Sequence, residues 1–98
     1  MIRVRFISPA KREVLNAIDY YNEQRPGLGI ELAREIRLTT KRVKEHPFAW
    51  TRIDENIRCC PTNRFPYSLL YQMINKEIVI IALMHHKRHP DCWRDREQ

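Results

Sequence analysis

Basic, imidazole and phenol side chains gather in the second half of the chain, and their types are those needed to cleave a phosphodiester bond. Cleavage of RNA through its own 2′-hydroxyl needs a base, cations that stabilise the charged phosphorane, and an acid for the leaving oxygen. Histidines could move the protons, arginines could hold the phosphate, and tyrosines could stack on a nucleotide. The candidates are His85, His86, His89, Arg58, Arg64, Arg88, Tyr67 and Tyr71.

A nuclease active site and a protein-binding surface would draw on overlapping sets of these residues. If the chain cleaves RNA, we expect its catalytic groups to be His85, His86, Arg58 and Arg88. A binding surface needs basic charge and an exposed aromatic anchor, because tryptophan and arginine are enriched at interface hot spots. Trp93 is the candidate anchor, with a buried lid over the core as the alternative role for its side chain. The expected binding residues are Arg58, Arg64, Tyr67, Tyr71, Arg88, Trp93 and Arg96.

Strand geometry constrains two pairs of these candidates. Arg58 and Arg64 flank a short loop between predicted strands, where they either converge on one anion or point separately into solvent. His85 and His86 are adjacent at the end of the last predicted strand, so their side chains must face opposite sides of the sheet. We therefore expect the two imidazoles not to act together easily, with a structural role for at least one of them.

The spacing of cysteines and histidines gives no metal or disulfide pattern. The string from His85 to Cys92 matches neither a paired CxxC knuckle nor HExxH on a helix, and Pro90 interrupts any helix there. Cys59 and Cys60 are adjacent, and together with Cys92 they form an odd set without a stapled framework. We expect no metal ion, no cofactor and no cysteine nucleophile, and the free thiols favour a reducing cytoplasm.

The composition indicates a folded domain with an acidic partner. Hydrophobic residues make up 43% of the 98 residues, and we expect one domain over residues 1–98. The net charge of +6 attracts nucleic acid, the ribosome and an acidic protein segment alike. The longest apolar run, from Ile78 to Met84, is far too short to cross a membrane, and the N-terminus lacks the pattern of an export signal.

Hydrophobic periodicity predicts a strand, two helices and three further strands. Residues 2–6 alternate apolar and basic, and Ser8 followed by Pro9 is typical of a helix N-cap. Two apolar stripes at helical spacing follow, separated by the glycine and proline cluster of residues 24–29. The expected elements are a strand at 2–6, helices at 10–22 and from 28 to before Pro47, an irregular segment at 47–55, and strands at 56–60, 65–74 and 78–86.

This order, strand-helix-helix-strand-strand-strand, predicts an α+β fold. The short link between the helices favours an antiparallel helical hairpin packed on one face of a mostly antiparallel four-stranded sheet. From Ile78 to Met84 both alternating sets of residues are apolar, which predicts a central strand that is covered on both faces.

Short motifs in a specific order and spacing run through nearly the whole chain. They are Asp19-Tyr20-Tyr21, Pro26-Gly27-Leu28-Gly29, Ile57-Arg58, Arg64-Phe65-Pro66-Tyr67, Tyr71, and a tail that contains His85, Arg88, Pro90, Trp93 and Arg96. Together they resemble the RelE/ParE superfamily of toxins, and within it the ParE-like plasmid stabilisation branch. The resemblance implies the toxin of a bacterial type II toxin-antitoxin pair. It also implies a cognate antitoxin, whose C-terminal segment wraps over the toxin and covers its working surface.

The resemblance leaves the target open, since some members cleave mRNA on the ribosome and ParE-type members poison DNA gyrase. This chain departs from the mRNA-cleaving pattern, with Ser68 in place of an arginine and Trp93 in place of a tyrosine. The indole N–H does not titrate, so Trp93 cannot replace a tyrosine as acid or base. We therefore expect growth arrest through binding to DNA gyrase. A ribosome-dependent mRNA endoribonuclease and a non-toxic basic nucleic-acid-binding domain are the alternatives.

Overall fold

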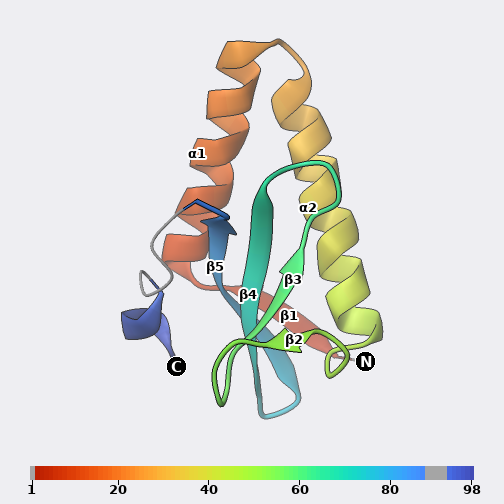
Figure 1. Cartoon of the computed structure of the whole chain (residues 1–98), viewed down its shortest axis with the longest axis vertical. Coiled ribbons are helices and arrows are strands. Elements are labelled where there is room, and N and C mark those ends of the chain that lie inside the picture. Colours follow the sequence, from red (N-terminus) through yellow and green to blue (C-terminus); the bar gives the residue numbers. More distant parts are fainter. Residues whose placement is uncertain (1, 88–92) are drawn as a thin grey trace.

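The order of helices and strands in the computed structural model agrees with the order expected from the sequence, with one short strand added (Figure 1). The structure describes residues 2–87 and 93–98. Its elements are β1 (Arg3–Phe6), α1 (Ser8–Gln24), α2 (Leu28–Glu45), β2 (Thr51–Arg52), β3 (Arg58–Pro61), β4 (Tyr67–Ile74), β5 (Glu77–His85) and a 3₁₀ turn, η1 (Arg94–Arg96). The predicted α+β class is confirmed. In this described part of the chain, no helix has the length and apolar character needed to span a membrane.

The strands form one mixed sheet in the order β1-β5-β4-β3-β2. β1 pairs with β5 in parallel, and all other neighbours are antiparallel. The sheet has one strand more than predicted, because β2 lies in the segment 47–55, which was expected to be irregular. It pairs with β3 through Thr51 with Cys59 and Arg52 with Arg58. A strand of 2 residues is too short to show an alternating pattern, so the sequence contains no periodic signal for it.

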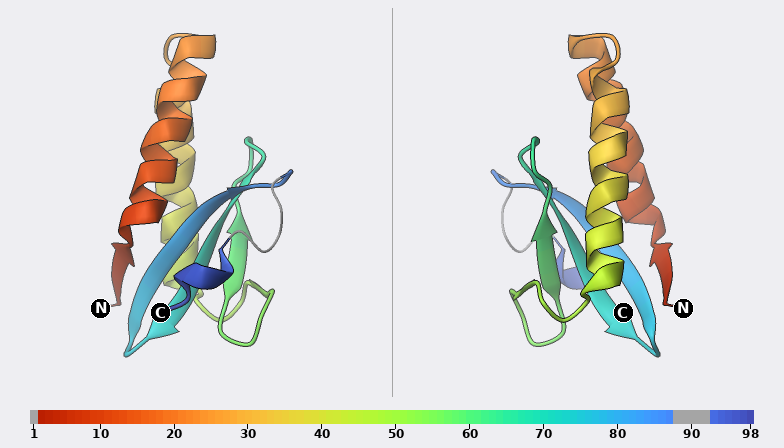
Figure 2. Two further views of the ribbon diagram at one scale, coloured as in Figure 1. Left: turned by 90° about the vertical axis from the view of Figure 1, so that its left-hand side faces the viewer. Right: turned by 90° about the vertical axis from the view of Figure 1, so that its right-hand side faces the viewer.

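Apolar side chains cover the sheet on both faces. The larger cluster lies between the sheet and the two helices, where Leu32 of α2 and Ile78 of β5 are fully buried. Figure 2 shows both helices along one side of the sheet. A second cluster on the other face contains Val79 and Ile81 of β5 together with Trp93. β5 therefore lies inside the sheet with both faces covered, as its two apolar sets of residues predict.

The chain passes from β1 into α1 without a loop. The N–H of Ile7 donates to the carbonyl oxygen of Ile80 at 3.1 Å, which extends the pairing of β1 with β5 up to the helix. Ser8 was expected to be the N-cap, but Ile7 holds that position and no side chain caps the helix. Pro9 still suits the first turn, because the N–H that it lacks would have no helical partner there.

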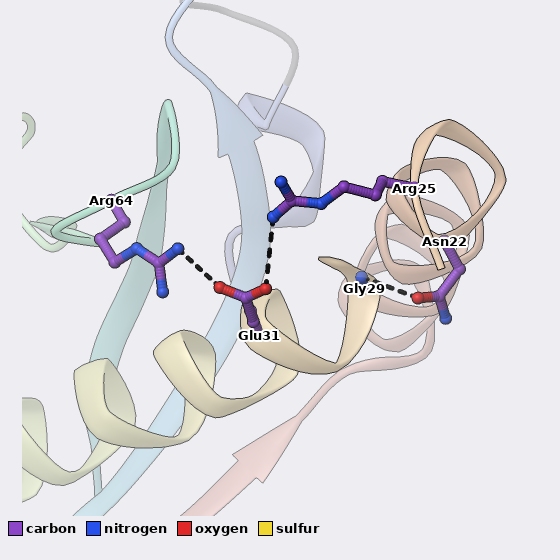
Figure 3. A network of polar contacts seen from close by, with 5 residues as sticks. All are labelled: Asn22, Arg25, Gly29, Glu31 and Arg64. Atoms are coloured by element: carbon purple, nitrogen blue, oxygen red, sulfur yellow. Dashed lines mark hydrogen bonds and ion pairs between the residues drawn. The ribbon is translucent and has the colours of Figure 1, made fainter. Parts of the chain in front are cut away.

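The link between the helices depends on both glycines of the chain. Gly27 is the N-cap of α2 and has a φ of 92°, in the left-handed region that favours glycine. The N–H of Gly29 donates to Asn22 Oδ1 at 2.8 Å (Figure 3). At Gly29 the two helices approach so closely that a Cβ atom would overlap the carbonyl oxygen of Ile18.

Glu31 joins this end of the helical hairpin to the sheet (Figure 3). Its carboxylate accepts a hydrogen bond from Arg64 Nη2 at 2.6 Å and lies 3.5 Å from Arg25 Nη2. The hydrogen bond from Arg64 holds the pKa of Glu31 below its usual value. Because its pKa is lowered in the folded state, the Glu31 carboxylate stabilises the fold at pH values above the ordinary carboxyl pKa, and this stabilisation is lost as the pH falls. The exposure of the carboxylate keeps the effect small.

Replacing Gly29 by alanine is expected to lower the free energy of unfolding by about 1–3 kcal/mol, because the helices must move apart to accept the methyl group. Urea denaturation followed by circular dichroism measures this change. Gly27→Asn is the control, since a Cβ atom at Gly27 meets nothing within 4 Å and asparagine tolerates a positive φ. Equal losses in the two variants would contradict the close approach at Gly29.

Candidate functional site

The two strand-end histidines point to opposite faces of the sheet, as the alternation predicts. His85 packs edge-to-face on Tyr67, with ring centroids 5.1 Å apart, and lines a hollow next to α1. His86 is exposed on the other side, where its Nε2 lies 3.0 Å from Ser68 Oγ. One phosphate held on one face of the sheet therefore cannot use both imidazoles as its acid and base.

Arg58, at the start of β3, binds the loop that follows α2. Its Nη1 donates to the carbonyl oxygens of Phe48 at 3.0 Å and Trp50 at 2.7 Å. Beside it, the hydroxyl of Tyr71 donates to the carbonyl oxygen of Pro47 at 2.6 Å. Burial raises the pKa of Tyr71 to about 12, so this phenol stays protonated at neutral pH and is no general base.

Arg64 lies beyond the other end of β3 and faces α2. Besides binding Glu31, its guanidinium lies over the ring of Phe65, 5.6 Å from the centroid. Arg58 and Arg64 therefore do not converge on one anion, as one of the two expected arrangements required. A strand separates them, and each guanidinium has protein acceptors of its own.

Tyr67 packs in an aromatic cluster beneath α1. Its ring lies edge-to-face against Tyr21, with centroids 6.2 Å apart, and Tyr21 in turn contacts Phe65 at 5.2 Å. Tyr71 is fully buried. These two tyrosines were expected to bind a nucleotide or a partner, and the structure places both in the packing between the sheet and the helices.

The segment of residues 93–98 covers the sheet face that lies away from the helices. Trp93 is 3% exposed and packs in the cluster with Ile57, Leu70 and Val79. Of the two roles expected for Trp93, the structure has the buried lid, so the indole is not an exposed anchor. The cause is the apolar outer face of β5, which needs an apolar cover.

Arg96 fastens this segment to α1 and β5. Its Nη1 donates to Glu13 Oε1 at 2.7 Å and lies 3.3 Å from the carbonyl oxygen of Ile81. The same Glu13 oxygen accepts the N–H of Leu83 at 3.1 Å. Because β1 pairs with β5 only as far as Ile80, these side chains satisfy backbone groups on the unpaired part of the β5 edge. Arg96 therefore has a structural partner at the position where a binding residue was expected.

Arg88, expected in both the catalytic and the binding set, lies outside the described residues, as do His89 and Cys92. Within residues 2–87 and 93–98, no group of three or more metal-binding side chains lies together. Burial raises the pKa of the Cys60 thiol to about 11 and also raises the pKa of Cys59, so neither is a thiolate at neutral pH.

A groove of about 910 Å³ lies beside β1, which forms a free edge of the sheet. It is lined by Ile2, Arg3, Val4, Arg5, Phe6, Lys11, Lys44 and Glu77. Arg5 is paired with Glu77 at 3.3 Å, whereas Arg3, Lys11 and Lys44 make no ion pair within the described part of the chain. The alternation at residues 2–6 was the available signal, but it does not tell which strand forms an edge.

A second surface that the sequence did not indicate surrounds Phe48, in the loop after α2. Phe48 is 67% exposed and Ile53 is 38% exposed. Arg52 and Arg58 flank a hollow of about 200 Å³ beside the phenyl ring. We call Phe48, Arg52 and Arg58, which line this hollow, the Phe48 patch. An exposed apolar surface edged by arginines is typical of a protein interface.

Residues 4–90 match a family described as the ParE toxin of the type II toxin-antitoxin system parDE. The chain belongs to the ParE toxin family. A solved structure described as the chromosomal ParDE TA system from P. aeruginosa shares the fold, with a TM-score of 0.76 and 17% sequence identity. The similarity covers 87% of this chain and 96% of that chain. No curated protein matches the chain by sequence.

The serine that departs from the mRNA-cleaving pattern lies on the face of this ParE-family toxin away from the helices. Ser68 is 4% exposed, and its hydroxyl forms a hydrogen bond with Nε2 of His86. Leu70, two residues further along β4, packs on the same face in the cluster that holds Trp93. An arginine at position 68 would have to bury its guanidinium on this apolar face, and burying a charge is costly unless it is paired.

Replacing Trp93 by alanine is expected to lower the free energy of unfolding of the toxin by about 3–5 kcal/mol, the usual loss for truncating a buried tryptophan. Guanidinium denaturation followed by circular dichroism measures it. Phe48→Ala is the matched control, because it truncates an aromatic ring that is 67% exposed and should cost less than about 0.5 kcal/mol. If the Trp93 variant were as stable as the control, the lid would not exist in solution.

Proposed function

We propose that this toxin arrests bacterial growth by binding DNA gyrase in the cytoplasm, and that it does not cleave mRNA. A ribonuclease needs a base, cations and an acid around one phosphate. The described candidates for these tasks have four separate sets of neighbours: Tyr67 for His85, Ser68 for His86, backbone carbonyls for Arg58 and Glu31 for Arg64. This dispersion speaks for a toxin that acts by binding.

The covered sheet face is the observation that carries this proposal. Trp93 lies over the sheet on the side away from the helices, and Arg96 holds the segment in place through Glu13. An RNA strand would have to displace a buried indole and break an ion pair to reach this face. Contact with a large target therefore has to use other surfaces of the toxin.

We assign the Phe48 patch to the target. Phe48 offers an exposed aromatic anchor, and Arg58 is held beside it by two carbonyl acceptors, with its guanidinium 5.6 Å from the ring centroid. Arg52 is likewise held by the carbonyl oxygen of Glu55 at 3.1 Å. Side chains that are already ordered lose less conformational entropy on binding, which favours affinity.

In a supercoiling assay with gyrase and relaxed plasmid, the toxin is expected to inhibit, and Phe48→Ala is expected to weaken inhibition at least about tenfold, as for a hot-spot residue. Tyr20→Ala is the control, because Tyr20 is a 55% exposed aromatic side chain on α1, outside the patch. Its inhibition should equal that of the unaltered toxin.

The same protein is incubated with translating ribosomes and mRNA. Codon-spaced cuts that disappear in His85→Ala, His86→Ala or Arg58→Ala variants would overturn the binding mechanism and make the protein a ribosome-dependent endoribonuclease. Unchanged growth of bacteria that express the chain without an antitoxin would point instead to a non-toxic basic nucleic-acid-binding domain.

We further propose that the cognate antitoxin occupies the groove beside β1. The free edge of β1 can accept an extended segment as an additional strand, with Val4 and Phe6 available for apolar side chains. Arg3, Lys11 and Lys44 would then face acidic residues of that segment. Charge and shape together favour an acidic, partly apolar peptide.

Exchanging Arg3 and Lys44 for glutamate together is expected to weaken binding of the antitoxin at least about tenfold, because the segment's carboxylates would meet like charges. Isothermal titration calorimetry with the cognate antitoxin measures the affinity. The pair Arg12→Glu and Lys76→Glu, both exposed and outside the groove, is the charge-matched control. An equal loss of affinity in both double variants would exclude the groove as the specific binding site of the antitoxin.

A further inference from the structure

We propose that the outward face of α2 is a binding surface for the phosphate backbone of duplex DNA. This surface goes beyond the proposed function, because it lies apart from the Phe48 patch and does not depend on which enzyme the toxin inhibits. Four cations share this face, the neighbouring acids have other partners, and cations outnumber the exposed apolar side chains.

Four basic residues recur along α2 at intervals that place them on one face of a helix, opposite the buried side. They are Arg34, Arg37, Lys41 and Lys44, and all four are exposed. The buried side of α2 carries Leu32 and Val43, which pack toward the sheet. At a rise of about 1.5 Å per residue the four cations span about 15 Å, and we call them the α2 stripe.

The α2 stripe keeps most of its positive charge. None of its members forms an ion pair with another residue of the described chain. The acids of α2 are engaged elsewhere: Glu31 binds Arg25 and Arg64, and Glu35 is buried and accepts the N–H of Asn63 at 3.0 Å. The remaining acid of the helix is its last residue.

The make-up of the α2 stripe favours nucleic acid over an acidic protein. Protein interfaces have an apolar centre from which lysine is depleted. Here a row of cations predominates. Of the exposed apolar residues of the helix, Ile30 precedes the row, and Leu38 lies beside it, one turn after Arg34. A row of cations is what phosphate contacts require, and 15 Å corresponds to about four base-pair steps of a duplex.

The position of the stripe allows DNA and a protein target to be bound together. In the right-hand view of Figure 2, α2 lies in front of the other elements, and the four residues of the α2 stripe are exposed. The Phe48 patch follows α2 in the chain and lies on β2, β3 and the loop before them. Only Lys44 is shared with the groove beside β1, and it is therefore left unchanged in the test.

The test measures binding of the isolated toxin, without gyrase, to a fluorescent duplex of about 20 base pairs by anisotropy at several salt concentrations. The stripe variant combines Arg34→Gln, Arg37→Gln and Lys41→Gln. The control combines Arg12→Gln, Lys76→Gln and Lys87→Gln, which removes the same charge from exposed positions elsewhere. Glutamine preserves helix propensity, and circular dichroism checks that both variants are folded.

The unaltered toxin and the control are expected to bind the duplex with similar affinity. The stripe variant should bind at least about tenfold more weakly at about 50 mM salt, and the slope of log Kd against log salt should fall by roughly one per removed contact. Equal weakening in both variants would mean that diffuse charge, and not α2, attracts DNA. No measurable binding of the unaltered toxin, or equally tight binding of a polyglutamate peptide, would also overturn the proposal.

These outcomes are independent of the gyrase proposal. A stripe variant that loses DNA binding while it still inhibits gyrase on plasmid supports two separate surfaces. A toxin that binds DNA through α2 but fails to inhibit gyrase would overturn the proposed function and leave the α2 surface intact.

Discussion

The apolar character of β5 on both faces is the constraint on which the rest of the structure depends. A strand with Ile78 and Ile80 on one side and Val79 and Ile81 on the other cannot leave either side in water without a large loss of hydrophobic stabilisation. The helical hairpin covers the first side, and the segment that carries Trp93 covers the second. The sheet is therefore an interior layer of the molecule and offers neither face as an open platform.

This arrangement moves the binding capacity of the toxin from the faces of the sheet to its margins. The groove follows the free edge of β1, the Phe48 patch follows the short strand β2, and the cations of the α2 stripe lie on the back of the helical layer. Three other arginines are bound within the protein itself. Arg58, Arg64 and Arg96 bind carbonyls or carboxylates of the protein itself and thereby hold loops and ends of the chain in place.

Sequence patterns were sufficient to predict the parts of the fold that depend on residues close together in the chain. Periodicity located the helical hairpin, alternation located the central strand and separated His85 from His86, and the motif order indicated the toxin family. These patterns were insufficient wherever a partner distant in sequence decides the outcome. Nothing near Arg64 reveals that Glu31 lies opposite, and the polar tail left both an exposed anchor and a buried lid open for Trp93. β2 was not predicted, because a strand of 2 residues is too short to show an alternating pattern.

The bond between Glu13 and Arg96 joins residues 83 positions apart, and that between Arg5 and Glu77 joins residues 72 apart. Contacts between residues so far apart in the sequence form only after long loops have closed. Loop closure has an entropic cost that native contacts compensate only afterwards. The parallel pairing of β1 with β5 belongs to the same class. The helical hairpin, by contrast, is local and can form early. Loop-closure entropy therefore favours contacts within the helical hairpin over those that join the first strand, the fifth strand and residues 93–98.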